Sequence, residues 1–319
     1  MPYCADQLLV HVCRHRTCHC SRFVIAAQSR PVGAGVPGAL GSGHDQVAPH
    51  GPGQRPDWQN PRMPIALITG PTSGIGRAFA LQLAARGLDV VLVARDEARL
   101  DALAETLHSR FAVSVEVMVA DLTASDDLAR VAARLRSAER PIHTLVNNAG
   151  FGAGAMFEDA TGELVDRMIA LHVTAVTRLT HAALPGMRAR RSGLILTVAS
   201  VAGLLPAMSS PPYGATKAYQ VALMEGLAGT LVGSGVRVVA VCPGLTRTEF
   251  HQRAGLDLSR LPRVVWLSPH RVVSDALRAA ARGVVISIPT KRYRYAIRAA
   301  SLAPRGTSAR IVRRRRPES

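Results

Sequence analysis

Short apolar runs alternate with longer amphipathic segments over residues 63–288, and this alternation limits the fold more than any other feature of the chain. The expected strands cover residues 65–69, 89–94, 113–119, 142–146, 194–198, 236–241 and 284–288, and the expected helices cover 75–86, 97–110, 125–139, 162–190, 213–232 and 274–281. Gly87 is the expected C-cap of the first helix and Ser125 the expected N-cap of the third. Apolar strands separated by helices are typical of a parallel sheet covered on both faces. The sequence therefore predicts an α/β fold: a single domain with a doubly wound parallel sheet of about seven strands and helices on both faces.

The chain is strongly basic, with 39 Lys and Arg against 22 Asp and Glu and a formal net charge of +17. Because 48% of the residues are apolar, the chain can bury a large core, which excludes a wholly disordered chain, a collagen and a coiled coil. From Thr290 to the end there are ten basic residues and one acid, so more than half of the excess charge lies in residues 290–319. Nucleic acid or an anionic membrane surface must therefore be considered as a partner. We favour the interpretation of residues 289–319 as a solvated basic tail, because charge runs commonly are solvated.

Residues 1–62 differ in composition from the rest of the chain. They contain four of the five cysteines (Cys4, Cys13, Cys18 and Cys20), and residues 31–60 are rich in Gly and Pro. The cysteine and histidine spacing matches no common zinc pattern. We expect a disordered or mis-assigned N-terminal extension with Met63 as the true start, which mass spectrometry of the native N-terminus would test. With Cys242 as the one remaining cysteine, and with no secretory signal or membrane span predicted, we expect a cytoplasmic protein; peripheral membrane contact through the basic tail is the alternative.

A glycine-rich turn joins the first expected strand to the first expected helix. It contains Thr69, Gly70, Ser73, Gly74, Ile75 and Gly76. The glycines permit a tight turn and a close approach of the backbone to a ligand, and the N–H groups at the start of a helix attract phosphate. The turn indicates a nucleotide-binding site, and an ordinary strand–helix connection is the alternative.

The spacing of this turn and the motifs after the later strands resemble the short-chain dehydrogenase/reductase family. The matching segments are Thr69–Gly76, Asp121-Leu122, Asn147-Asn148-Ala149-Gly150, Ser200, Tyr213 with Lys217 in Y-x₃-K, and Pro243-Gly244 with Thr246 and Thr248. The resemblance covers about residues 64–288. It implies a Rossmann-type sheet, a nicotinamide cofactor held by these segments, a hydride transfer between that cofactor and a carbonyl or secondary alcohol, and a homodimer or homotetramer.

Tyr213 and Lys217 are spaced to share one face of a helix, one turn apart. An ammonium about 4 Å from a phenol could supply about 4 kcal/mol at an effective dielectric of 20, which would lower the pKa of the tyrosine by about three units before desolvation opposes it. We therefore expect Tyr213 to exchange a proton with the substrate, with Lys217 lowering its pKa and holding the ribose. Ser200 would donate a hydrogen bond to the substrate oxygen.

His172 stands where the family usually has an asparagine that supports a water-linked proton relay from the lysine. An imidazole also donates and accepts hydrogen bonds, so His172 could serve in the relay. The alternative is a histidine packed beneath the site, with the relay rearranged.

Family members that prefer NAD carry an acid at the end of the second strand, where this chain has Ala94, followed by Arg95. An arginine suits the 2′-phosphate of NADP through its charge and its planar fork of donors. Asp96 is the next residue and could instead cap the following helix. We expect NADP(H) to be favoured, with NAD(H) as the alternative.

The substrate region is expected to be apolar. Its candidate residues are Phe151, Met156, Phe157, Phe250, Leu256, Leu258, Leu261 and Trp266. They indicate a ketoacyl, steroid-like or other lipid-like ketone or alcohol, although they could merely cover the sheet edge. The rival function is a catalytically silent Rossmann-fold protein that binds nucleic acid or anionic membrane through its tail. Ser200, Tyr213 and Lys217 argue against that rival, because a binding scaffold has no need of a tyrosine with an adjusted pKa.

Overall fold

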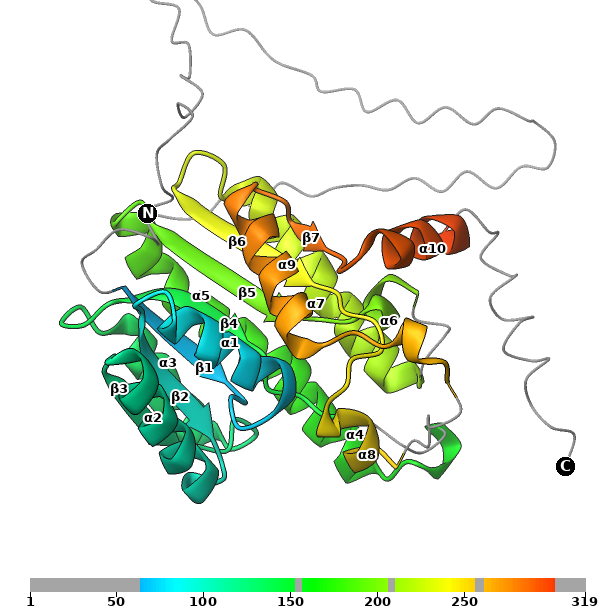
Figure 1. Cartoon of the computed structure of the whole chain (residues 1–319), viewed down its shortest axis with the longest axis horizontal. Coiled ribbons are helices and arrows are strands. Elements are labelled where there is room, and N and C mark those ends of the chain that lie inside the picture. Colours follow the sequence, from blue (N-terminus) through cyan, green and yellow to red (C-terminus); the bar gives the residue numbers. More distant parts are fainter. Residues whose placement is uncertain (1–63, 153–156, 206–209, 256–260, 302–319) are drawn as a thin grey trace, which may run out of the picture. The chain divides into compact units, whose positions relative to one another are not determined.

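The computed structural model describes residues 64–152, 157–205, 210–255 and 261–301, which all lie in the second of the two units into which the chain divides, Pro52–Ser319. Seven strands in these residues form one parallel sheet in the order β3-β2-β1-β4-β5-β6-β7 (Figure 1). They are β1 (Ile65–Thr69), β2 (Asp89–Ala94), β3 (Val115–Val119), β4 (Ile142–Asn147), β5 (Gly193–Val198), β6 (Val236–Val241) and β7 (Ile286–Ser287). The prediction of a single doubly wound α/β domain is confirmed.

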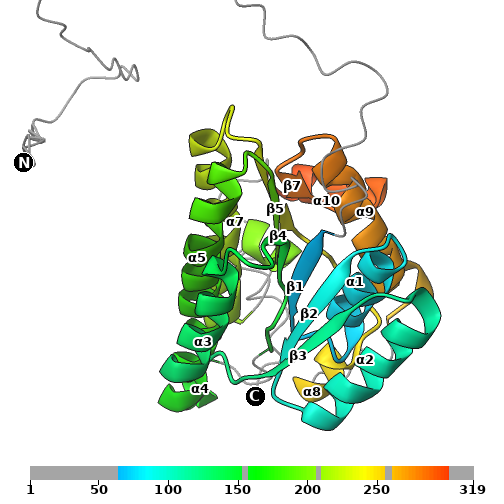
Figure 2. The same cartoon turned by 90° about the vertical axis from the view of Figure 1, so that its left-hand side faces the viewer.

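Helices cover both faces of the sheet. They are α1 (Gly74–Ala84), α2 (Glu97–Phe111), α3 (Ser125–Arg136), α4 (Gly162–Ile169), α5 (Val176–Ala189), α6 (Val201–Leu204), α7 (Pro211–Thr230), α8 (Glu249–Arg253), α9 (Pro269–Ala281) and α10 (Lys291–Ser301), with a π-helical segment η3 (Ala170–Ala175) between α4 and α5. Figure 2 shows α1, α2 and α9 on one face and α3, α5 and α7 on the other. None of these helices is both long and apolar enough to cross a membrane.

Successive strand residues point into different cores. Leu67 and Val91 belong to the apolar cluster on the α3–α5–α7 face, while Ile68 and Leu92 belong to the cluster on the α1–α2–α9 face. Side chains alternate across a strand, so a sheet covered on both faces needs apolar residues at every position. This requirement explains why the strands are largely apolar in sequence, with β1 and most of β2 as continuous apolar runs.

Several element ends differ from the expected ones. Helix α1 ends at Ala84, and Gly87 follows it with a φ of 81°. Ser125 is the first residue of α3 rather than its N-cap: Ala124 takes that position, and the Ser125 hydroxyl donates to Asp126 instead. The last strand is only Ile286–Ser287.

Helix α9 begins at Pro269, five residues earlier than expected, because Ser268 caps it by accepting from the Arg271 N–H. The long helix expected over 162–190 is interrupted by η3. A π-helical turn keeps a helical spacing of side chains, so the sequence pattern did not distinguish it; such turns are frequent at functional sites.

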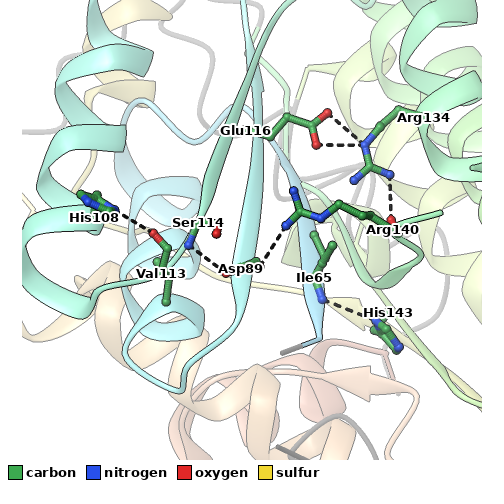
Figure 3. A network of polar contacts seen from close by, with 9 residues as sticks. All are labelled: Ile65, Asp89, His108, Val113, Ser114, Glu116, Arg134, Arg140 and His143. Carbon is green, nitrogen blue, oxygen red and sulfur yellow. Dashed lines mark hydrogen bonds and ion pairs between the residues drawn. The ribbon is translucent and has the colours of Figure 1, made fainter. Parts of the chain in front are cut away.

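Polar contacts tie together the amino-terminal ends of the strands (Figure 3). Asp89, at the start of β2, is 5% exposed and accepts from the Ser114 N–H at 2.8 Å and from the Arg140 guanidinium at 3.0 Å. Nearby, Arg134 Nε lies 2.9 and 3.0 Å from the two carboxylate oxygens of Glu116. Ligands bind at the carboxyl ends of parallel strands, so this network braces the edge of the sheet opposite the expected site.

Candidate active site

The carboxyl ends of β1 and β4 are joined by side chains that were expected to bind cofactor. The Thr69 hydroxyl accepts from the N–H groups of Asn148 and Ala149 at 2.9 and 3.0 Å. The Asn148 amide donates to the carbonyls of Thr69 and Gly70 at 3.0 and 2.9 Å. β1 and β4 are the neighbours at which the strand order reverses, so these bonds fix the crevice where doubly wound sheets hold ligands.

The glycine turn has little space for side chains. Gly70 and Gly74 have φ angles of 64° and 55°, and a Cβ on Gly76 would collide with the Gly70 carbonyl. Ser73 occupies the N-cap of α1 without a side-chain capping bond. The first N–H groups of α1 therefore have no side-chain cap, as at helix starts that can bind an anion. Ile75, like Leu122 beyond β3, packs against an apolar core cluster.

Arg95 and Asp121 face each other where β2 and β3 end. Their closest charged atoms lie 3.6 Å apart, and the Arg95 side chain is 66% exposed. Asp96 is the N-cap of α2 and accepts from the Arg99 N–H at 3.1 Å. Its carboxylate thus caps the helix and pairs with Arg99, and Arg95, which lies beside Asp121, is an exposed positive charge at the end of β2.

The segment after β6 folds over the glycine turn. The Pro243 carbonyl accepts from the Val201 N–H at 3.0 Å, and the Thr246 hydroxyl donates to the Gly244 carbonyl at 2.9 Å. Thr248 caps α8, and its methyl group would lie 2.8 Å from a Cβ on Gly74. The structure thus brings together the glycine turn and the threonines that the sequence assigned to the same cofactor.

Ser200 and Tyr213 meet at the end of β5. Ser200 is the N-cap of α6 and accepts from the Ala202 N–H at 3.1 Å. Burial raises the pKa of Tyr213 to about 12, although a hydrogen bond from the Ser200 side chain opposes the rise. The phenol is therefore protonated at neutral pH.

Lys217 does not lower the pKa of Tyr213 as the sequence argument expected. Its Nζ lies 5.8 Å from the centre of the Tyr213 ring and donates to the Val198 carbonyl at 2.8 Å and to Gln220 Oε1 at 3.0 Å. The side chain is 4% exposed, and burial lowers the pKa of Lys217 to about 7. The amine is only partly charged at neutral pH and is aimed at other acceptors, so desolvation dominates the titration of the tyrosine.

His172 lies fully buried in η3, between the ring of Phe151 and that of Tyr213. Its Nε2 accepts from the Phe151 N–H at 3.2 Å, so the proton of the neutral ring is on Nδ1, which donates to the Thr216 hydroxyl at 3.1 Å. Both ring nitrogens are thus bonded to protein groups. Burial first, and then the charge of Lys217, hold the pKa of His172 well below its ordinary value.

Aromatic side chains line one side of Tyr213. Successive ring centres lie 5.8 Å apart from Tyr213 to Phe250, 5.4 Å from Phe250 to His251 and 5.5 Å from His251 to Trp266. Phe157 and Leu261 are 55% and 38% exposed. Met156, Leu256 and Leu258 lie outside the described residues.

Two residues that support the candidate site were not predicted from the sequence, Gln220 and Tyr293. Gln220 binds Lys217, and its position three residues later on α7 was the only signal in the sequence. Tyr293 of α10 packs against Gly244, accepts from the Leu245 N–H at 3.2 Å and donates to the Val265 carbonyl at 2.8 Å. The first part of the expected basic tail is therefore a helix whose tyrosine supports the loop after β6.

Metal ligands do not gather in the described part of the chain, which holds no cluster of three or more His, Cys, Asp or Glu residues that could bind a metal ion. The cysteine- and histidine-rich segment of residues 4–20 lies outside it.

Residues 64–258 match the family model described as short chain dehydrogenase. Among solved structures, a short-chain dehydrogenase from Sphingobium yanoikuyae in complex with NADPH is 40% identical, with a TM-score of 0.69, and the match covers 80% of this chain and 97% of that one. The bulky-bulky ketone specific alcohol dehydrogenase from Comamonas testosteroni is 35% identical, with a TM-score of 0.65, and the match covers 76% and 95% of the two chains.

A curated relative, the very-long-chain 3-oxoacyl-CoA reductase of Anas platyrhynchos, is 34% identical over 189 residues. The match spans 58% of this chain and 60% of that protein, so this chain matches less than two thirds of the relative's length. These three relatives are named as reductases or dehydrogenases, and they lend no support to the binding-protein alternative.

Proposed function

The chain belongs to the short-chain dehydrogenase/reductase family, and from this premise we propose that it is an NADP(H)-dependent reductase of apolar ketones. The observation that carries the proposal is the buried contact of Tyr213 with Ser200 and Lys217 at the carboxyl ends of the strands. Family membership also supports a homodimer or homotetramer, which light scattering would test.

The residues at the strand ends fit a dinucleotide. The uncapped start of α1 suits the pyrophosphate, and a side chain at Gly76 would obstruct its approach. Arg95 is exposed and its neighbour Asp96 is used as a helix cap, which favours a 2′-phosphate over a bare ribose hydroxyl. When bound, the nicotinamide supplies the hydride that adds to the carbonyl carbon.

The chain's own residues supply the proton. Tyr213 is protonated at neutral pH and donates its phenolic proton to the carbonyl oxygen as that oxygen gains negative charge. The Ser200 hydroxyl has its acceptor side bonded to Ala202, so its proton is free to point toward Tyr213 or the substrate oxygen. A protonated tyrosine is the form that reduction requires, which favours the ketone-to-alcohol direction.

The substrate class follows from the rings around Tyr213. Phe250, His251 and Trp266 form a continuous series that begins beside the phenol. Burial lowers the pKa of His251, so this wall carries little charge at neutral pH. We infer a bulky, apolar ketone, in keeping with the substrate named for the Comamonas enzyme.

Tyr213→Phe tests the proposal on NADPH oxidation with 3-ketoacyl thioesters, ketosteroids and small aldehydes. The variant removes only the phenolic oxygen, so we expect turnover to fall by about a thousandfold. The control is Tyr219→Phe, which alters a phenol on the same helix that bonds Thr177 at 2.7 Å. Equal activity in the two variants, or no turnover of any ketone by the unaltered chain, would refute the proposed function.

Arg95→Ala tests the cofactor. Loss of the guanidinium removes the charge that would meet the 2′-phosphate, so we expect KM for NADPH to rise by about tenfold or more while KM for NADH stays nearly constant. Arg110→Ala, at the other end of α2, is the matched loss of an exposed arginine. An unchanged ratio of the two KM values in Arg95→Ala would overturn the assignment to NADP(H).

A further inference from the structure

Gln220 is a buried amide next to the proposed catalytic lysine. It lies on α7, three residues after Lys217, and is 1% exposed. A buried amide is stable only where its donors and acceptor find partners. The partners of Gln220 therefore indicate why a polar side chain is kept at this position.

Both ends of the amide are bonded. Gln220 Oε1 accepts from Lys217 Nζ at 3.0 Å, and Gln220 Nε2 donates to the main-chain carbonyl of His172 at 2.8 Å. An ammonium can only donate and a carbonyl can only accept, so the two partners fix the orientation of the amide. The side chain forms a bridge from Lys217 to η3.

No other side chain of η3 makes this connection. The ring of His172 is committed to Phe151 and Thr216. A Cβ at Gly150 would lie 2.9 Å from His172 Nε2 and 3.7 Å from Lys217 Nζ, so a glycine at this position leaves the imidazole and the amine their space. The link between Lys217 and η3 passes through Gln220.

We propose that Gln220 is a positioning residue, whose amide holds the Lys217 amine between Val198 and η3 at the distance from Tyr213 that proton transfer requires. The inference deepens the proposed function and rests on it. Gln220 touches neither substrate nor cofactor in this scheme and acts through Lys217.

The titratable groups that face Lys217 come from three elements: Tyr213 from its own helix, His172 from η3 and Cys242 from the end of β6. Beside them, Lys217 has two neutral acceptors, the Val198 carbonyl and the Gln220 side chain. Removal of the Gln220 amide disfavours the charged amine and lowers the pKa of Lys217, whereas a carboxylate in its place raises that pKa.

Two substitutions at one position give opposite predictions. In Gln220→Met, which keeps the length of the side chain, we expect kcat to fall by about tenfold with little change in KM for the ketone. The alkaline limb of the kcat–pH profile should move down by about one pH unit in Gln220→Met and up by a similar amount in Gln220→Glu. A merely structural role predicts no such opposite shifts.

Gln82→Met is the matched control. Gln82 is another buried glutamine with two partners, donating to the His270 carbonyl at 2.9 Å and accepting from the Ser274 hydroxyl at 3.0 Å, and it joins α1 to α9. Its loss should reduce stability as much as that of Gln220 but leave the pH profile in place.

The titration of Lys217 can be measured without turnover, because the chain has only two lysines, Lys217 and Lys291. Full-length protein labelled with ¹³C and ¹⁵N in lysine gives two sets of side-chain NMR signals, one for each lysine. The set that is lost in Lys291→Arg belongs to Lys291. Opposite shifts of the Lys217 titration in Gln220→Met and Gln220→Glu support the bridge. An unchanged titration in folded Gln220→Met overturns it, even if the unaltered chain reduces ketones. Shifted titrations without turnover of any ketone would refute the proposed function and leave the contact itself intact.

Discussion

At the scale of single residues, His172 shows how burial changes the role that a residue type suggests. From its place in the sequence it was a candidate for a proton relay. In the structure the ring is fully buried and both nitrogens are bonded to Phe151 and Thr216. The side chain that accepts a hydrogen bond from Lys217 is that of Gln220, whose partners lie 48 and 3 residues away in the chain. No local pattern reveals the bond between Gln220 and His172, because it depends on how η3 packs against α7.

The lowered pKa of His172 has a consequence for stability in acid. The unfolded chain binds a proton at this histidine near pH 6.5, while the folded chain resists it. The contribution of His172 to the free energy of unfolding is therefore constant above about pH 6.5. Below that pH the free energy of unfolding falls, by up to about 1.4 kcal/mol per pH unit from this group.

His172→Asn removes this group, so we expect a smaller loss of stability between pH 6.5 and 5.5 than in the unaltered chain. Urea unfolding at the two pH values measures it. The other histidines are present in both proteins, so their contributions cancel in the comparison. Identical pH slopes would show that His172 is not held neutral.

At the scale of elements, the candidate site and a polar network that stabilises the fold lie at opposite ends of the strands. The site residues follow the carboxyl ends of the strands, whereas Asp89, Glu116, Arg134 and Arg140 form the polar network at the amino ends. Strand positions were predictable, because strands of a sheet buried on both faces are mostly apolar on both sides. The bracing contacts were not, because they join residues of different strands and helices.

Asp89→Ala tests that division. It leaves the Ser114 N–H and the Arg140 guanidinium without their acceptor, and we expect a loss of about 2 to 3 kcal/mol in the free energy of unfolding. Arg140 is 55% exposed, so Arg140→Ala should cost about 1 kcal/mol or less. Urea denaturation gives both values. A large change of kcat in folded Asp89→Ala would show that the network at the amino ends of the strands also affects the candidate site at their carboxyl ends.

At the scale of the whole molecule, motifs after successive strands located most of the candidate site in advance. Each lies where a parallel strand ends, so one fold prediction placed them at one edge. The pKa of Tyr213 was predicted in the wrong direction, because the attraction of Lys217 was given more weight than the desolvation that opposes it, and desolvation dominates for a buried phenol. The charge run of the C-terminal segment indicated a solvated tail, so the structural role of Tyr293 was not predicted. Its hydroxyl joins α10 to the loops at Leu245 and Val265.

The burial of Lys217 also bears on how the protein can be handled chemically. Of the two lysines, Lys217 is enclosed, while Lys291 lies exposed at the start of α10. Reagents that acylate lysine side chains will therefore react at a single lysine, Lys291 on α10, rather than at Lys217 of the candidate site. A dye, an affinity tag or a solid support coupled through Lys291 would attach the molecule in one orientation, without modifying the lysine beside Tyr213.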